Sequence, residues 1–242
     1  KTAQYGQEDK IGWWNTITAA DIDGNGTQDL IVGNLGLNSK HKASLDQPFK
    51  IISKDFDGNG TNDIALGYYN NNTLYPVRGL QCSAEQNPDL KQRIGSYTEF
   101  ANLTFDQVYS KYDLKDAISL SATYFESALF LNDGAHLTIQ ALPKENQLAP
   151  TNAIMVKDLN KDGRLEIITV GNLFPVEVET GRYDAHVGTI SHFNKNFSTV
   201  SMDQSGFFTD KDARDLAYIV INGKPHVMVA NNRDVLQFFN IN

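Results

Sequence analysis

The sequence has few of the residues that mark several common protein classes. One cysteine, Cys82, occurs in 242 residues, so the chain cannot form an internal disulfide. Lysine and arginine total 21 against 29 acidic residues, and the net charge of −8 leaves no basic patch of the kind that binds nucleic acid. No apolar run approaches the roughly 18 residues of a membrane-spanning helix. We therefore expect neither a nucleic-acid partner nor a membrane span.

Two further features are missing from the sequence. The given sequence contains no signal peptide and starts abruptly at Lys1, so we expect a mature form or an excised part of a longer chain. The five histidines form no H-E-x-x-H pair, and no G-x-S-x-G elbow, phosphate-binding loop or dinucleotide fingerprint occurs. His186 and His192 are expected to lie on one face of a strand, which favours a half-buried surface pair over zinc binding or catalysis. No catalytic residue and no organic-cofactor site is predicted.

What the sequence does contain is one nine-residue pattern, repeated. Each copy has oxygen-bearing side chains at positions 1, 3, 5 and 9 and glycine at position 6. Ca²⁺ prefers six to eight oxygen ligands from a flexible loop, and glycine tolerates the positive φ of a sharp bend. Three copies favour metal binding over ordinary Asx-Gly turns, which remain the alternative. The copies are 21–29 (DIDGNGTQD), 55–63 (DFDGNGTND) and 158–166 (DLNKDGRLE).

The pattern predicts two to three Ca²⁺ sites. Positions 1, 3, 5 and 9 would contribute side-chain oxygens, and position 7 would contribute its backbone carbonyl. Three bound ions would neutralise six of the eight net negative charges. The predicted ligands are Asp21, Asp23, Asn25, Thr27 and Asp29 in the first loop, Asp55, Asp57, Asn59, Thr61 and Asp63 in the second, and Asp158, Asn160, Asp162, Arg164 and Glu166 in the third.

The flanks of the loops distinguish them from EF-hands. An EF-hand needs a glutamate at position 12 and a helix on each side. Position 12 is instead Val32, Leu66 or Thr169, and short β-branched apolar runs flank every loop. Such runs are typical of buried strands. The repeat therefore predicts a unit of strand, calcium loop and strand.

The spacing of the loops indicates an insertion. The first two loops start 34 residues apart, whereas the third starts 103 residues after the second. Between them, residues 83–118 break the strand pattern, and Ser96 and Thr104 each open a capping-box sequence. We expect two or three short helices there, as a connector rather than as a lid that binds a partner or ligand.

Further strands are expected after this insertion. A hairpin around Asn132-Asp-Gly134 and a C-terminal meander with an Asn222-Gly223 turn are predicted from their turn residues. Residues 210–215 resemble a degenerate fourth loop without the glycine, and we expect no metal there. The polar loop 177–184 is expected to be a structural turn with an Arg182–carboxylate pair, in preference to a glycan site. A four-stranded sheet is predicted from 152–157, 166–171, 186–192 and 196–202.

The loops and several segments outside them resemble the FG-GAP/VCBS repeat family, whose calcium loops also occur in integrin α-subunit propellers. The resemblance implies a mainly β fold built from three to four β-propeller-type blades, as a complete small propeller or an arc of a larger one. It covers nearly all of 1–242, taken as a single domain with the helical insertion at about 83–118. The segments outside the loops are 12–15, 33–38, 147–150, 177–184, 205–208 and 229–232.

The family resemblance implies a location outside the cell or in the bacterial cell envelope, where calcium is abundant. The function we expect is a non-catalytic, calcium-stabilised module that binds a protein or a glycan. Further blades of the same full-length chain are another expected partner. The alternative is a polysaccharide lyase or hydrolase built on a calcium-binding propeller.

Overall fold

The computed structural model describes residues 5–241 and shows a mainly β protein, with 37% of residues in strands and 13% in helices. The strands form four antiparallel sheets. The chain divides into two compact units. Within the described range, the first unit comprises residues 5–8, 12–40 and 125–241, and the second comprises 9–11 and 41–124.

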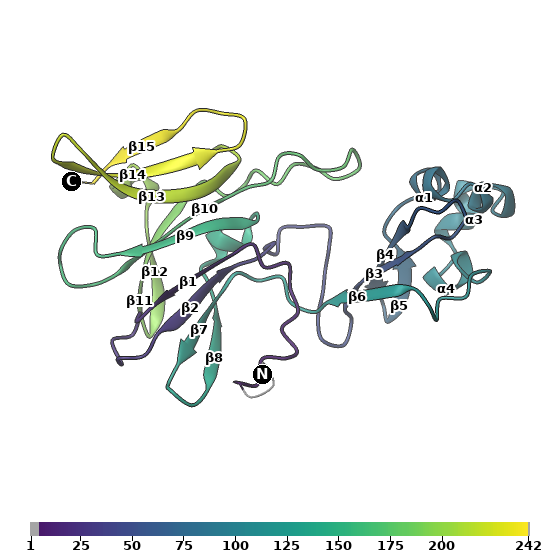
Figure 1. Ribbon diagram of the computed structural model, residues 1–242, viewed down its shortest axis with the longest axis horizontal. Helices are drawn as coiled ribbons and strands as arrows, with labels where there is room; N and C mark the ends of the chain where they lie inside the picture. Colours follow the sequence, from purple (N-terminus) through teal and green to yellow (C-terminus); the bar gives the residue numbers. More distant parts are fainter. Residues whose placement is uncertain (1–4, 242) are drawn as a thin grey trace. The chain divides into compact units, whose positions relative to one another are not determined.

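The first sheet of the first unit has the order β1-β2-β7-β8 (Figure 1). Leu30 on β2 is opposite Phe130 on β7, although 100 residues separate them in sequence. The second unit is therefore inserted between two neighbouring strands of one sheet. The predicted Asn132-Asp-Gly134 hairpin is confirmed as the β7–β8 connection. The strands are β1 (Thr16–Ala20), β2 (Asp29–Gly33), β7 (Ala128–Asn132) and β8 (Leu137–Ala141).

The second sheet follows chain order, as β12-β11-β10-β9. The prediction of a four-stranded sheet from these segments is confirmed, except that β11 begins at Thr189 rather than at residue 186. The strand starts later than predicted because Gly188 adopts a φ of +80° and turns the chain just before it. The strands are β9 (Thr151–Lys157), β10 (Glu166–Gly171), β11 (Thr189–Asn194) and β12 (Asn196–Val200).

The third sheet is the predicted C-terminal meander, in the order β13-β14-β15. Asn222 and Gly223 both have positive φ, 50° and 76°, as a two-residue hairpin turn of the primed type requires. A short helix, α5 (Met202–Ser205), precedes the sheet. The strands are β13 (Ala213–Ile221), β14 (Lys224–Asn231) and β15 (Gln237–Asn240).

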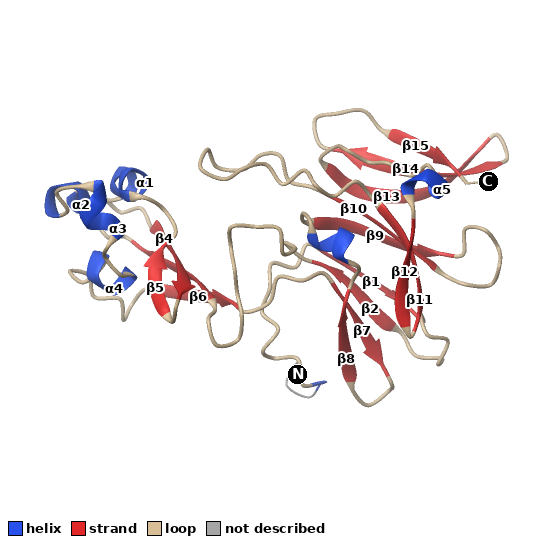
Figure 2. Cartoon of the chain, turned by 180° about the vertical axis from the view of Figure 1, so that it is seen from behind, coloured by secondary structure: helices blue, strands red, loops and turns tan. Residues whose placement is uncertain are grey.

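Strand β10 of the second sheet is buried on both faces. Ile167 of β10 packs with Ile31 and Leu129 of the first sheet, whereas the adjacent Ile168 packs with Val227 and Val229 of the third. Successive side chains of a strand point to opposite faces, so β10 contributes to two cores at once. All six residues of β10 are buried, which explains why its apolar run is continuous rather than alternating. The three sheets of the first unit are thus stacked face to face (Figure 2).

The second unit has its own sheet, in the order β5-β4-β3-β6. Four short helices accompany it (Figure 2). The strands are β3 (Phe49–Lys54), β4 (Asp63–Asn70), β5 (Thr73–Pro76) and β6 (Ile118–Ala122), and the helices are α1 (Leu80–Gln86), α2 (Asp89–Arg93), α3 (Tyr97–Ala101) and α4 (Phe105–Val108).

Two helices, α3 and α4, begin where the capping residues predict, but the segment forms four helices rather than the two or three expected. Ser96 Oγ accepts the backbone N–H of Glu99 at 3.1 Å, and Thr104 forms a complete capping box with Gln107. Buried residues of the helices, including Leu90 and Phe105, pack in one core with Phe56 of the second loop. The helical segment therefore covers a sheet. The inserted unit is also longer than the expected 83–118 segment, because the second nine-residue loop belongs to it.

Candidate metal centres

Each of the three nine-residue loops joins the two strands of an antiparallel hairpin. The residue at position 9 is the first residue of the second strand, opposite the last residue of the preceding one. Strands flank each loop on both sides, so the EF-hand alternative is excluded and the strand–loop–strand prediction is confirmed. The register pairs are Ala20↔Asp29, Lys54↔Asp63 and Lys157↔Glu166.

The aspartate at position 1 is held by backbone N–H groups of its own loop. Asp21 accepts the N–H groups of Gly24 at 2.9 Å, Asn25 at 3.0 Å and Gly26 at 2.9 Å. Asp55 accepts the three equivalent N–H groups at 2.7, 3.0 and 2.8 Å. The hydrogen bond from Gly60, with those from Gly58 and Asn59, holds the pKa of Asp55 below its usual value. Loop N–H groups therefore hold both carboxylates in place before any cation arrives.

The loop backbone is left-handed at two positions. At position 6, Gly26, Gly60 and Gly163 have φ values of 88°, 89° and 84°, as expected. Position 4 is also left-handed, with φ of 75° at Gly24 and 76° at Gly58. The left-handed conformation of position 4 was not predicted from the sequence, because the third loop has Lys161 there, at φ 62°. A lysine in this region costs about 1–2 kcal/mol, so the third loop carries strain that the other two avoid.

The role of position 2 was not predicted from the sequence, although all three loops have an apolar residue there. The position 2 N–H groups of Ile22, Phe56 and Leu159 donate to the position 9 carboxylate at 2.8, 3.1 and 2.6 Å. Their side chains belong to the hydrophobic cores below the loops. Position 2 thus anchors the loop and orients the acid at position 9.

The carboxylates converge in the first two loops. Ligand oxygens of Asp21, Asp23 and Asp29 lie within 4.8 Å of one another, and so do those of Asp55, Asp57 and Asp63. Calcium–oxygen bonds of about 2.3–2.6 Å allow one ion to contact oxygens up to about 5 Å apart. The position 9 acids are buried, with Asp29 fully enclosed and Asp63 only 7% exposed.

One of these acids, Asp63, also shows the electrostatic cost of the cluster. Burial raises the pKa of Asp63, and the negative charges of Asp57 and Asp55 raise it further. A bound cation would relieve this repulsion. The chemistry of both clusters therefore fits a hard divalent ion. The position 7 carbonyls of Thr27 and Thr61 remain predicted ligands.

The third loop has a similar backbone cage and a different charge. Asp158 accepts the N–H groups of Asp162 at 3.1 Å and Gly163 at 3.0 Å. Its three carboxylates do not form a tight cluster like those of the other loops within residues 5–241. Lys161 and Arg164 also place two cations in this loop, whereas the other loops contain none.

The expectation that His186 and His192 share one strand face is wrong. His186 precedes β11 and is fully buried, where its Nδ1 accepts the N–H of Gly188 at 3.1 Å and its Nε2 lies 3.3 Å from Thr169 Oγ1. Burial lowers the pKa of His186 to about 4, so the ring is a neutral core group near pH 7. His192 alone lies on the strand and is half-buried.

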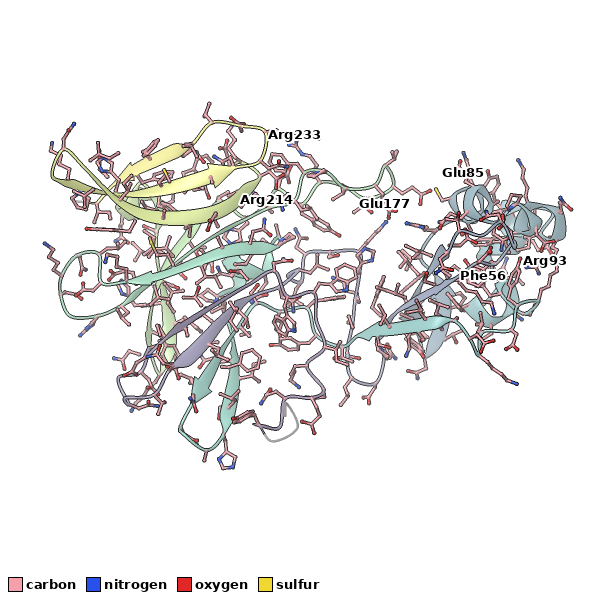
Figure 3. All side chains as sticks on the ribbon, viewed as in Figure 1. Phe56, Glu85, Arg93, Glu177, Arg214 and Arg233 are labelled. Carbon is pink, nitrogen blue, oxygen red and sulfur yellow. The ribbon has the colours of Figure 1, made fainter. Side chains whose placement is uncertain are left out.

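The polar loop 177–184 is pinned at both ends to its own unit. A β-bridge joins Leu173 to Tyr183, whose hydroxyl is 3.0 Å from Ser39 Oγ. Glu177, labelled in Figure 3, forms an ion pair with Lys40 at 3.3 Å. The predicted Arg182–carboxylate pair is present, with Asp184 at 3.5 Å. The hydrogen bonds and ion pairs of this loop are those of a structural turn.

The carboxylate of the degenerate loop 210–215 faces a cation. Asp212 is 2% exposed, and its Oδ1 lies 2.7 Å from Arg214 Nη2. Its Oδ2 accepts the amide of Asn232 at 2.9 Å. The buried Asp212 carboxylate is thus paired with Arg214 and Asn232.

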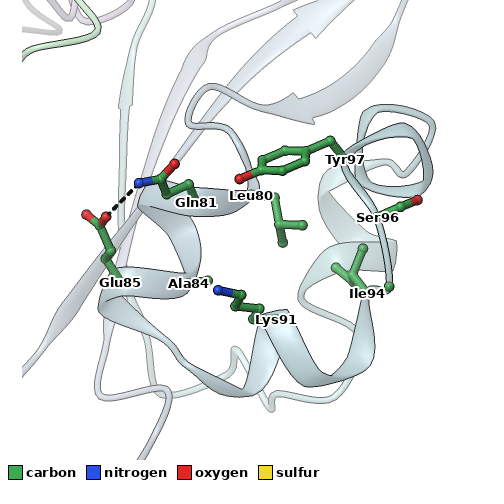
Figure 4. Close-up of a pocket in the computed structure, with 9 residues that line it drawn as sticks. Leu80, Gln81, Ala84, Glu85, Lys91, Ile94, Ser96 and Tyr97 are labelled. Carbon is green, nitrogen blue, oxygen red and sulfur yellow. Dashed lines mark hydrogen bonds between the residues drawn. The ribbon is translucent and has the colours of Figure 1, made fainter.

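A cavity of about 520 Å³ lies among helices α1 to α3 of the second unit (Figure 4). Leu80, Ala84 and Ile94 give it apolar walls, while Lys91 and Tyr97 contribute polar groups at its edge. Tyr97 is 66% exposed, an unusual position for a large aromatic ring. Exposed aromatic rings beside polar groups suit the recognition of a ligand that has both apolar and polar faces.

No helix in residues 5–241 is long and apolar enough to cross a membrane. Comparison with models of known protein families gives no match for this chain, and comparison with curated protein sequences gives none either.

Proposed function

We propose that this protein is a calcium-binding β-module of the FG-GAP/VCBS type, without catalytic activity, that presents a binding surface for a protein or glycan outside the cell or at the cell envelope. The observation that carries the proposal is the pair of carboxylate clusters at Asp21–Asp23–Asp29 and Asp55–Asp57–Asp63. Each lies in an N–H cage at the same place in a hairpin, which is what a repeated metal site requires.

The sheets support the blade interpretation. Three four-stranded antiparallel sheets each have one nine-residue loop between two adjacent strands. This is the arrangement that the family resemblance implies for a propeller blade. The three stacked sheets of the first unit are consistent with consecutive blades, either of a small propeller or of an arc completed by further blades of a longer chain.

Calcium would act in this fold by joining the strands on either side of each loop. An ion that binds only the folded protein stabilises it by about 2.7 kcal/mol per site at roughly 100-fold excess over Kd. The second unit has only one such loop, so the ion would be a large part of its stability. We therefore expect the melting temperature to fall when a chelator removes calcium.

Thermal melting with and without a chelator, combined with elemental analysis, tests this proposal. Retained calcium and a lower melting temperature in chelator would support it. An unchanged melt with no calcium in the purified protein would refute it. Magnesium added in place of calcium is the control, because Mg²⁺ demands a tighter octahedral shell than these loops offer.

The helical cavity of the second unit is the candidate binding surface. Tyr97→Ala removes its exposed ring, and Tyr5→Ala removes another exposed tyrosine ring, in the first unit, as a control. A glycan array should show binding that Tyr97→Ala weakens and Tyr5→Ala does not. Cleavage of a polysaccharide on the array would instead support the lyase or hydrolase alternative.

A further inference from the structure

The third loop differs from the first in the surroundings of its position 9 acid. Asp29 uses both carboxylate oxygens, because Ile22 donates to one at 2.8 Å and the backbone N–H of Asn132 donates to the other at 2.8 Å. Glu166 accepts the N–H of Leu159 at 2.6 Å through Oε2, but its Oε1 is buried without a hydrogen-bond partner. The side chain is only 5% exposed, so this oxygen is shielded from water and no backbone N–H reaches it.

The group that faces this oxygen is the imidazole of His192. The two residues are register partners on the adjacent strands β10 and β11. His192 Nδ1 lies 3.4 Å from Glu166 Oε1, and this nitrogen is also buried without a hydrogen-bond partner. A buried polar atom that makes no hydrogen bond destabilises the fold, so two such atoms facing each other call for a group that satisfies both.

The separation of the two atoms suits a shared metal ion. Metal bonds of about 2.0–2.1 Å to nitrogen and oxygen in a tetrahedral shell place neighbouring ligand atoms about 3.4 Å apart. The observed Nδ1–Oε1 distance is 3.4 Å. An ion between Glu166 and His192 would satisfy both atoms without moving either strand.

The charge of the third loop also disfavours calcium. Its three acids are offset by Lys161 and Arg164, whereas the three acids of the first loop have no cation beside them in the repeat. Calcium affinity depends on the number of charged oxygen ligands. An imidazole nitrogen instead favours borderline transition cations such as Zn²⁺. Both features shift the preference of this loop in the same direction.

A cavity gives access to the pair. About 260 Å³ of space is lined by Glu166, His192 and Asn160, the position 3 residue of the loop. Phe207 and Phe239 contribute an apolar wall. A small cation with its remaining water ligands fits this volume.

We propose that Glu166 and His192, with the third loop, form a mixed nitrogen–oxygen site for a transition divalent cation of the Zn²⁺ type, distinct from the calcium sites of the first two loops. The inference deepens the proposed function, since it rests on the third loop holding a metal, but it assigns that loop a different ion.

Zinc titration of the full chain in saturating calcium tests this site, with native mass spectrometry to count the ions. We expect one Zn²⁺ beyond the bound calcium, and His192→Gln should weaken it at least about tenfold. Calcium binding by the first two loops should be unaffected by His192→Gln. His226→Gln changes another half-buried strand histidine, on β14, and is the matched control.

Zinc binding that His192→Gln leaves unchanged, or weakens no more than His226→Gln does, would overturn the proposal. Calcium displacing zinc from this site would also overturn it. If calcium fails to bind the first two loops while zinc behaves as expected, the proposed function fails and this site stands. Imidazole NMR of the unsubstituted protein needs no variant: the His192 signals should shift on addition of Zn²⁺ and not of Ca²⁺.

Discussion

At the scale of single residues, the glycines at position 4 of the loops hold a conformation that other residues adopt at a cost. Gly58 has a φ of +76°, and a Cβ added there would meet no heavy atom within 4 Å. Any loss of stability on substitution is therefore conformational rather than steric.

We expect Gly58→Ala to lower the free energy of unfolding of the second unit by about 1 kcal/mol, measured by urea denaturation. Gly95→Ala is the control in the same unit, because its Cβ would make only an ordinary 3.5 Å contact and its φ is not left-handed. The control should change stability by less than about 0.5 kcal/mol. Equal losses in the two variants would contradict the conformational explanation.

His186 predicts how stability depends on pH. Its pKa is about 4 in the folded protein against 6.5 for a free histidine, so between these values the unfolded chain binds a proton that the folded chain does not. Stability should therefore fall by about 3 kcal/mol as pH drops from about 6.5 to about 4. Denaturation across this range measures the slope, and His186→Gln should make it shallower. An unchanged slope in the variant would contradict the assignment.

Among the structural elements, each nine-residue loop is held in place by its own hairpin. Asp55→Ala removes the acid that receives three loop N–H groups, so we expect the protein to lose one calcium equivalent and keep the others, measured by calorimetric titration. Asn62→Ala, at position 8 of the same loop, should retain all of them. A simultaneous loss of calcium from the first loop would show that the sites are coupled.

The elements also show which expectations depend on local sequence. The Thr104 capping box, the Asn222-Gly223 turn and the strand–loop–strand hairpins all formed where the residues indicated. Each depends on contacts within a few residues. The position of His186 did not follow from local pattern, because its backbone is set by Asn172, which bonds both its N–H and its carbonyl at 2.9 Å.

At the scale of the whole molecule, the two units have separate hydrophobic cores. The core that contains Phe56 and Phe105 lies in the second unit, and the cores around Ile167 and Ile168 lie in the first. Each unit also has its own candidate calcium site.

We therefore expect differential scanning calorimetry in calcium to resolve two transitions. Asp55→Ala should lower the midpoint of one, and Asp21→Ala should lower the midpoint of the other, because each removes a ligand from a different unit. A single two-state transition that both substitutions shift equally would contradict this division.

Ligand spacing, capping and turn chemistry act over about ten residues, so the three loops, their strand flanks and the helical segment could be predicted from the amino-acid sequence. The pairing of β2 with β7 across an inserted unit, and the presence of the second loop in that unit, could be seen only in the fold. The fold also places Glu166 Oε1 opposite His192, whereas the corresponding oxygen of Asp29 accepts a backbone N–H. These features depend on which distant strands become neighbours, and strand pairing is set by how whole sheets bury their apolar faces together.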